Sequence, residues 1–235
     1  MPTVRLENVT KVYKSKDRRG PAILDVTFRF DQGEFIFLTG SRGAGKSTVM
    51  DIIAGELTPD NGAIFVDDVN MKRMGVVQRT RYRRSVGRVR QEPELVRNET
   101  VLRNLTGKNL LSYVKDKAKN DARIQKSLGL VGMPGCENRY PLEFSLSECK
   151  RIELAKAILH TPQILLLDEI TERTDGDTVW DMLHLLKEIN ERLGTTVIMA
   201  TNSAAVVNYM RQRVITLADG KLVGDVRKGR LGYIE

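Results

Sequence analysis

The 235-residue sequence predicts an α/β fold in which a mostly parallel sheet carries a phosphate-binding loop. Three observations indicate this fold. The segment "GSRGAGKST", residues 40–48, follows a strand-like run and opens a helical pattern. Two short apolar runs, "QILLLDE" and "TTVIMATN", are typical of strands that are buried on both faces of a parallel sheet. Helical patterns alternate with these runs along the chain, which is typical of the α/β class.

The individual elements follow in order. Strand-like runs rich in β-branched and aromatic residues cover residues 4–13, 22–30 and 34–40, and a shorter run covers 63–68 after the turn "TPDNG". The strands at the start of the chain are expected to pair antiparallel. Helical patterns are expected over about residues 46–55, 100–113, 119–130, 145–160 and 177–193. Ser145 and Glu148 form a capping-box signal for the fourth helix, and Asp219-Gly220 predicts a hairpin within residues 213–226.

The composition fits one soluble globular domain, with 41% hydrophobic and 29% charged residues. No run approaches the 18 or so consecutive apolar residues of a membrane span, and the N-terminal residues lack the apolar core of a secretory signal. Cys136 and Cys149 are too few for a disulfide or metal framework, which fits a reducing compartment. We therefore expect a cytoplasmic location.

The formal net charge of +8 is concentrated in the segment "QRTRYRRSVGRVRQ", residues 78–91. Its arginines are Arg79, Arg81, Arg83, Arg84, Arg88 and Arg90. Such a cluster could meet nucleic acid, an anionic membrane surface or an acidic partner. It could equally be a solvated surface that keeps the protein soluble. The sequence alone leaves these alternatives open.

The segment of residues 40–48 fits the motif G-x-x-x-x-G-K-[ST] in the strand-then-helix context that the motif requires. Its glycines allow the backbone to wrap around phosphates, whose charge suits a helix N-terminus. Lys46 is expected to reach the β- and γ-phosphates, and Ser47 to ligate Mg²⁺. The predicted ATP-binding residues of the loop are Gly40, Ser41, Arg42, Gly43, Ala44, Gly45, Lys46, Ser47 and Thr48.

A second element is needed to hold the metal and to activate water. The buried run "ILLLDE" ends in Asp168, which is suited to the Mg²⁺ shell, and Glu169, which is suited to polarise a water molecule. A core strand that ends in two solvated acids is the alternative. The presence of the phosphate-binding motif earlier in the chain favours the nucleotide site.

Five segments occur in the order and rough spacing of ATP-binding-cassette nucleotide-binding domains: the phosphate loop, "VRQEPEL", "FSLSECKR", "ILLLDE" and "VIMATN". The sequence resembles this family over essentially its whole length. The resemblance implies a P-loop NTPase fold with a RecA-like core, an antiparallel β subdomain and a helical subdomain. The core with its β subdomain would comprise about residues 1–90 and 161–235, and the helical subdomain about residues 92–160.

The resemblance also implies an ATPase that uses ATP and Mg²⁺. In the family, two cassettes pair head to tail on ATP binding, as a homodimer or with a second cassette, and each ATP lies between one phosphate loop and the partner's signature loop. The whole sequence is most similar to the branch that acts in cell division with an integral membrane partner, peripheral on the inner face of the cell membrane. Nucleic-acid members carry long insertions for which this chain has no room, so nucleic acid is not expected.

Residue roles carry over only where the sequence matches. Tyr13 would stack on adenine, although it could equally be a core residue of a strand. Gln91 would link Mg²⁺ and water to the helical subdomain, whereas the alternative is a polar surface residue. Asn202 stands where the family has a histidine that contacts the γ-phosphate. The signature-loop residues that would face the partner's ATP are Ser145, Leu146, Ser147 and Glu148.

The signature loop departs from the family pattern, because Leu146 and Ser147 replace two glycines while Cys149 and Lys150 replace two glutamines. The family's glycines let backbone N–H groups approach the γ-phosphate, and Leu146 adds a branched side chain there. A requirement for positive φ would add about 1–2 kcal/mol of strain. Cys149 could suggest redox control, but a small residue on a helix turn is the simpler interpretation.

Two further departures point the same way. Asn202 cannot carry the positive charge of a histidine, and charge-assisted hydrogen bonds are about twice as strong as neutral ones. The segment "ITERTD" after Glu169 also differs from the family's pattern. We therefore expect ATP binding with attenuated hydrolysis. A hydrolysis-deficient regulatory module that pairs with a competent cassette is the alternative.

Overall fold

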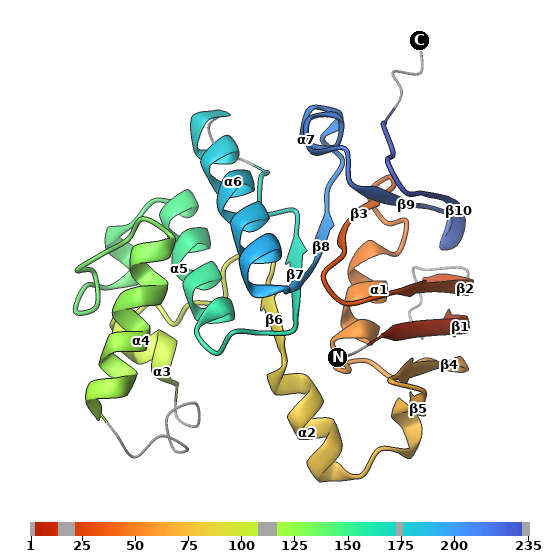
Figure 1. Ribbon diagram of the computed structural model, residues 1–235, viewed down its shortest axis with the longest axis horizontal. Helices are drawn as coiled ribbons and strands as arrows, with labels where there is room; N and C mark the ends of the chain where they lie inside the picture. Colours follow the sequence, from red (N-terminus) through yellow and green to blue (C-terminus); the bar gives the residue numbers. More distant parts are fainter. Residues whose placement is uncertain (1–2, 14–21, 108–116, 173–175, 232–235) are drawn as a thin grey trace.

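The computed structural model describes residues 3–13, 22–107, 117–172 and 176–231, which form two sheets, seven α-helices and two short 3₁₀ helices, Met71–Arg73 and Pro141–Glu143 (Figure 1). An antiparallel sheet has the order β2 (Ile23–Phe30), β1 (Val4–Lys11), β4 (Asn61–Val66) and β5 (Val69–Asn70). This sheet confirms the antiparallel start that the sequence predicts.

The second sheet has the order β10 (Lys221–Val226), β9 (Arg213–Ala218), β3 (Phe35–Thr39), β8 (Thr196–Ala200), β7 (Ile164–Asp168) and β6 (Val86–Val89). Its strands are parallel except for the edge strand β10, which pairs antiparallel with β9. Asp219 and Gly220, both with positive φ, form the predicted turn between β9 and β10.

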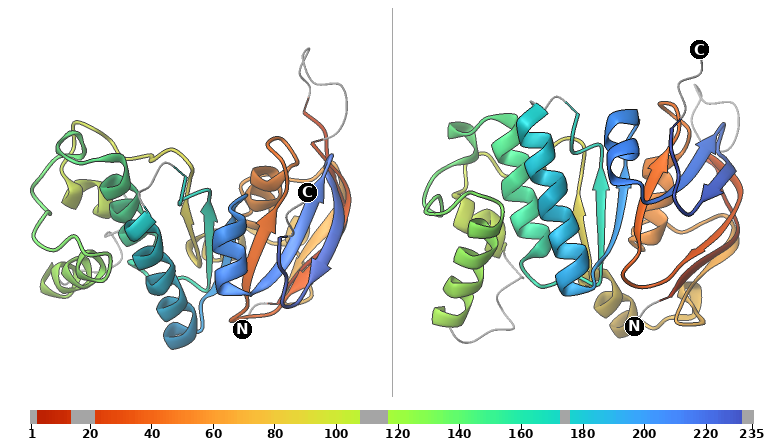
Figure 2. Two further views of the ribbon diagram at one scale, coloured as in Figure 1. Left: turned by 90° about the horizontal axis from the view of Figure 1, so that it is seen from above. Right: turned by 45° about the horizontal axis from the view of Figure 1, so that its top comes forward.

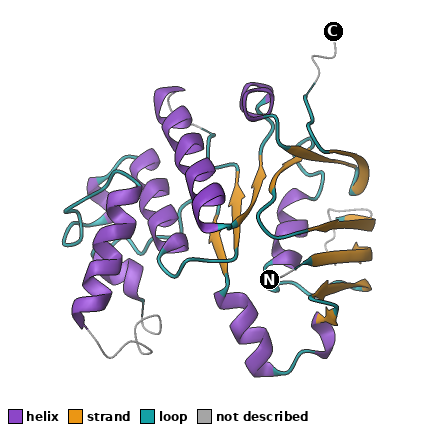
Figure 3. Ribbon diagram, in the orientation of Figure 1, coloured by secondary structure: helices purple, strands orange, loops and turns teal. Residues whose placement is uncertain are grey.

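The helices are α1 (Lys46–Ile53), α2 (Val76–Arg84), α3 (Val101–Thr106), α4 (Lys117–Leu130), α5 (Leu146–Ile158), α6 (Gly176–Leu193) and α7 (Ala204–Met210). Figure 3 shows α3, α4 and α5 gathered on the side away from the antiparallel sheet. The part of the predicted helix 100–113 beyond residue 107 lies outside the described residues. Among the described residues, no helix has the length and apolar character needed to cross a membrane.

The central strands are buried on both faces because each face packs against a different layer. Every residue of β3, β7 and β8 is buried, as the apolar runs predict. Ile36 and Leu38 of β3 pack in one core cluster with α1 and the antiparallel sheet. Phe35 and Phe37 pack in the other cluster, with α5 and α6. The ribbon shows α1 on one side of the parallel sheet and α6 on the other (Figure 2). Alternate side chains therefore reach opposite layers.

This topology brings the residues of the predicted nucleotide site to one edge of the parallel sheet. Leu38 of β3 and Asp168 of β7 both lie beside Ala200 of β8, so the three parallel strands end at the same level. The phosphate loop, Glu169 and Asn202 leave these strands at that edge. Ligands of open α/β sheets bind outside the carboxyl ends of the strands.

The sequence patterns missed α2, β6 and α7. The helix α2 lacks an apolar stripe, and Tyr82 is its one buried residue. Its stability comes from polar contacts, since Arg83 donates to the Gly55 carbonyl oxygen from Nε at 2.9 Å. The strand β6 is only four residues long, and α7 has seven residues with Ser203 as its N-cap. Short elements of this kind give too little periodicity to recognise.

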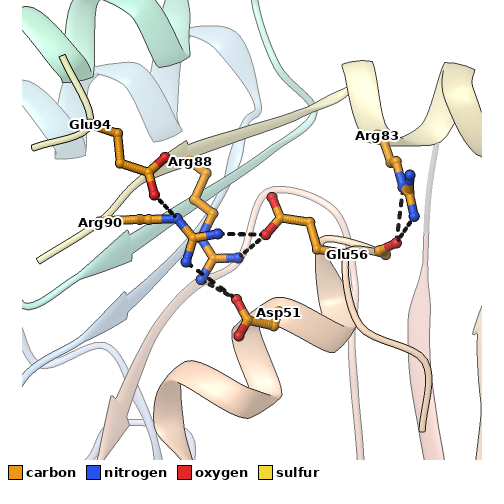
Figure 4. A network of polar contacts seen from close by, with 7 residues as sticks. Asp51, Glu56, Arg83, Arg88, Arg90 and Glu94 are labelled. Carbon is orange, nitrogen blue, oxygen red and sulfur yellow. Dashed lines mark hydrogen bonds and ion pairs between the residues drawn. The ribbon is translucent and has the colours of Figure 1, made fainter. Parts of the chain in front are cut away.

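The arginine cluster is largely used inside the molecule (Figure 4). Arg88 of β6 pairs with Asp51 of α1 at 2.5 Å and with Glu56 at 2.7 Å. Arg90 pairs with the same Glu56 at 2.7 Å and with Glu94 at 2.8 Å. These contacts brace α1 against β6, so Arg88 and Arg90 do not belong to an exposed basic surface that would meet nucleic acid.

Replacing Arg88 with alanine is expected to destabilise the fold by about 1–3 kcal/mol, because Asp51 and Glu56 each lose the less exposed of their two arginine partners and keep only Arg90. The Arg88 side chain is only 9% exposed, although Glu56 is 42% exposed and therefore partly screened. Urea unfolding followed by circular dichroism measures the loss. Arg81→Ala, on the exposed side of α2, is the matched control and should change stability by less than about 0.5 kcal/mol. Equal midpoints for the two variants would contradict the bracing role.

Candidate nucleotide-binding site

The phosphate loop between β3 and α1 has a backbone that requires glycine. Gly40, Gly43 and Gly45 have φ values of 141°, 85° and 102°, in the region that L-residues rarely adopt. A Cβ atom on Gly45 would lie 2.5 Å from the Ile23 side chain and 2.7 Å from the Ala22 carbonyl oxygen. Among the described residues other than its two chain neighbours, no atom lies within 4 Å of the position of a Cβ on Gly43. The loop is therefore packed at its base and open at its tip.

The helix α1 begins at Lys46, directly after Gly45. Its first-turn N–H groups have no intrahelical acceptors and favour an anion at this end. Ser47 is exposed and Thr48 is buried. Ser41, Arg42 and Gly43 on the outer side of the loop are exposed, while Ala44 is buried.

Lys46 lies at the centre of the site although its side chain is only 5% exposed. Its Nζ donates to the Gly40 carbonyl oxygen at 2.5 Å and to Asn202 Oδ1 at 3.3 Å. The same Nζ forms an ion pair with Glu169 Oε1 at 3.4 Å. The structure thus joins the phosphate loop, the end of β7 and the segment after β8 through one ammonium group.

Glu169 follows Asp168, the buried last residue of β7. Its φ of 48° is left-handed, which costs a non-glycine residue about 1–2 kcal/mol. Its N–H donates to the Ala200 carbonyl oxygen at 3.0 Å, which fixes this conformation. Strained backbone of this kind is found at functional sites. Here it accompanies a side chain that reaches Lys46.

Gln91 lies two residues after β6 and reaches the same cluster. Its Nε2 donates to Glu169 Oε2 at 3.3 Å and to Glu172 Oε2 at 2.6 Å. A hollow of about 140 Å³ adjoins the cluster and is lined by Glu169, Glu172, Asn202 and other residues of the same edge. Lys46, Glu169, Gln91 and Asn202 are therefore one connected set, and Gln91 is not an isolated surface residue.

The available donors fit magnesium. Asp168, Ser47 and Gln91 offer carboxylate, hydroxyl and amide oxygens, which are the hard ligands that Mg²⁺ prefers. In the described part of the chain, no cluster of three or more histidine, cysteine or acidic residues could hold a metal by itself. Mg²⁺ commonly takes one or two carboxylates and completes its shell with water and substrate phosphates. These residues therefore suit a metal that arrives with a nucleotide.

Tyr13 stands just beyond the end of β1 and is 36% exposed, so it is not a core residue of the strand. Its hydroxyl lies 3.5 Å from Thr48 Oγ1 in the first turn of α1. The ring thus borders the phosphate loop. Adenine stacking on this ring stays a prediction.

The signature segment begins α5 with the predicted capping box. The Glu148 N–H donates to Ser145 Oγ at 3.3 Å, and the Ser145 N–H donates to Glu148 Oε2 at 2.8 Å. The bonds that the Glu148 carboxylate accepts, mainly from the Ser145 N–H and also from Ser145 Oγ at 2.8 Å, hold the pKa of Glu148 below its ordinary value. Leu146 and Ser147 lie in the first turn without positive φ. The conditional strain penalty at these two positions therefore does not apply, and only the bulk of Leu146 remains as an obstacle.

The contacts among the described residues do not join the signature loop to the phosphate loop of the same chain. Cys149 is half-buried, and burial raises the pKa of its thiol, which makes it less reactive.

His184 is exposed and contacts Tyr209 on α7, and burial lowers the pKa of His160 after α5. Neither histidine takes part in the cluster around Lys46. The part of the segment after Glu169 that covers residues 173–175 lies outside the described residues.

Sequence reasoning missed the structural roles of two charged residues of α5, Lys150 and Glu153. Lys150 of α5 is only 2% exposed, and its Nζ donates to the Glu172 carbonyl oxygen at 2.6 Å. Glu153, one turn later, accepts the Glu94 N–H, and burial raises its pKa to about 7. The available signal in the sequence was that Lys150 and Glu153 lie next to the apolar residues Ile152 and Leu154 on a helix expected to be buried.

Comparison with known proteins gives one consistent family. A family model described as ABC transporter matches residues 23–172. The cell division ATP-binding protein FtsE of Mycobacterium tuberculosis is 37% identical over 97% of this chain and 98% of that protein. Methionine import ATP-binding protein MetN 1 of Oceanobacillus iheyensis is 32% identical over 94% of this chain and 65% of that protein.

Among solved structures, the ATP-binding cassette MJ0796, dimeric and bound to ADP and Pi after hydrolysis, is similar with a TM-score of 0.87. The two chains are 28% identical, and the match covers 97% of this chain and 100% of that chain. This similarity confirms the predicted fold class.

Proposed function

The chain belongs to the ABC transporter family, and we propose on that premise that it is an FtsE-type subunit whose Mg·ATP site is the cluster around Lys46. It is an ABC-type ATPase. The observation that carries the proposed site is the convergence of the glycine loop, Lys46, Glu169 and Gln91 at one edge of the sheet.

Each residue has a task that its surroundings support. The N–H groups of the loop and of the first turn of α1 bind phosphate oxygens, and Lys46 places its charge on the β- and γ-phosphates. Asp168, Ser47 and Gln91 would hold Mg²⁺, which would neutralise phosphate charge when bound. Glu169 orients a water molecule and accepts its proton. The contacts of its carboxylate with Lys46 and Gln91 place it at the centre of the site, which supports this role.

The signature loop acts on a second cassette. Ser145 to Glu148 are presented at the N-terminus of α5, away from the phosphate loop of their own chain. The matched cassette MJ0796 is dimeric, which supports the pairing of two cassettes here as well. The head-to-tail arrangement is what the family resemblance implies. We propose either a homodimer or a pair with another cassette, formed on ATP binding.

The proposed partner is an integral membrane protein resembling FtsX. The similarity to FtsE over nearly the full length of both chains supports this assignment. The protein would lie in the cytoplasm against the inner face of the cell membrane, where ATP-dependent closure of the pair moves the membrane partner in cell division and cell-wall remodelling.

A second function is favoured by Leu146, Ser147 and Asn202. In that case the chain holds ATP as a regulatory ligand and a competent cassette supplies the other half-site. The bulk of Leu146 and the neutral side chain of Asn202 weaken the contacts that reach the γ-phosphate. We propose attenuated hydrolysis as the first choice, because Lys46, Asp168 and Glu169 are all in place.

Phosphate release by the purified protein, with and without the FtsX-like membrane protein in lipid nanodiscs, tests the proposal. We expect slow Mg²⁺-dependent release that the membrane protein stimulates. Negligible release in both samples, with ATP still raising the melting temperature, would favour the regulatory module. An absence of binding heat at saturating Mg·ATP would contradict both functions.

A further inference from the structure

Glu172 makes the shortest contact to Gln91 in the site. The Gln91 amide nitrogen lies 2.6 Å from Glu172 Oε2 but 3.3 Å from Glu169 Oε2. Glu169 shares its other carboxylate oxygen with Lys46. The stronger hold on the Gln91 amide therefore comes from Glu172, through a hydrogen bond to a charged acceptor.

Glu172 is itself fixed at two points of its backbone. Its N–H donates to the Glu169 carbonyl oxygen at 3.1 Å, which closes a turn and sets the spacing of the two carboxylates. Its carbonyl oxygen accepts the buried Lys150 Nζ at 2.6 Å. Lys150 belongs to α5, the helix that carries the signature loop. The backbone of Glu172 is thus held from both the segment after β7 and α5, and its exposed side chain extends from this fixed point to Gln91.

A glutamine side chain has a donor end and an acceptor end, and the two carboxylates decide which end faces them. An amide oxygen facing Glu169 and Glu172 would meet only acceptors, so the NH₂ group must face both. Gln91 Oε1 is then directed to the other side of the amide. This oxygen is the atom of the side chain that can ligate a hard cation.

We propose that Glu172 is a positioning residue that orients the Gln91 amide so that Oε1 is presented to the Mg²⁺ of a bound nucleotide. The proposal rests on the proposed nucleotide site and deepens it. Glu172 acts through Gln91 and does not itself touch the metal. Replacing a residue that orients a metal ligand typically lowers metal affinity or activity by about 10- to 100-fold.

The test is calorimetric titration with the non-hydrolysable analogue AMP-PNP, once with Mg²⁺ and once with EDTA. Glu172→Ala is expected to weaken binding about 10-fold with Mg²⁺ and to leave binding in EDTA unchanged. Glu172→Gln keeps a neutral hydrogen-bond acceptor, so its affinity for AMP-PNP with Mg²⁺ should lie between that of Glu172→Ala and that of the wild type. Glu191→Gln, which removes a charge from the exposed side of α6, is the matched control.

A double-mutant comparison separates positioning from general destabilisation. If Glu172 acts through Gln91, Glu172→Ala should add no further loss in a Gln91→Ala background. Equal weakening with Mg²⁺ and EDTA, an additive loss in that background, or no loss at all would overturn the proposal. Failure of the wild-type protein to bind AMP-PNP would overturn the proposed function and the inference with it, and is distinguishable from a wild type that binds while the variants do not differ.

Discussion

Phosphate release by Glu169→Gln is expected to fall about 10²–10⁴-fold below the wild-type rate, the usual contribution of a general base. The Glu169 carboxylate lies 3.4 Å from Lys46 Nζ, and its left-handed backbone holds it there. Glutamine has nearly the same shape and keeps a hydrogen-bond acceptor, but it cannot take a proton from water. Malachite-green or coupled assays of phosphate measure the rate, and calorimetry checks that nucleotide binding is retained.

Nucleotide binding by this variant should be equal to or tighter than that of the wild type, since a negative charge next to the triphosphate has been removed. Glu191→Gln serves again as the control for the loss of one charge. If Glu169→Gln and the wild type release phosphate at the same rate, Glu169 is not the base. The regulatory-module interpretation then becomes the better one.

The fold and most of the site were predictable because their signals are local in sequence. The phosphate loop is nine consecutive residues, and "ILLLDE" places two acids at the end of one buried strand. The hairpin at Asp219-Gly220 and the capping box at Ser145 also depend on neighbours within four residues. Such features follow from short-range geometry and need no knowledge of the tertiary structure.

Features that depend on distant residues could not be predicted in the same way. The contact between Gln91 and Glu172 depends on the pairing of β6 with β7, and the burial of Lys150 depends on how α5 packs. The helix α2 has no apolar stripe, so it depends on arginine contacts to the end of α1. In each case a tertiary contact overrides the local pattern.

The structure also changes the argument for attenuated hydrolysis. Leu146 and Ser147 have ordinary helical backbone, so the signature loop carries side-chain bulk but no backbone strain at these positions. Asn202, by contrast, lies within the cluster around Lys46, where its Oδ1 accepts a hydrogen bond from Lys46 Nζ at 3.3 Å. An asparagine that accepts from Lys46 presents no positive charge to a phosphate. We therefore place the larger part of the proposed attenuation at residue 202.

Asn202→His is consequently expected to raise the rate of phosphate release by about 10²-fold, the usual worth of one preorganised contact to transition-state charge. An imidazolium can donate a charge-assisted hydrogen bond where the amide donates only a neutral one. The gain should be largest below the ordinary histidine pKa of about 6.5 and should diminish as the pH rises through it. Asn202→Ala, which supplies no donor, is the control and should not exceed the wild-type rate. A pH-independent rate for Asn202→His that equals that of the wild type would contradict this assignment and leave the bulk of Leu146 as the cause of slow hydrolysis.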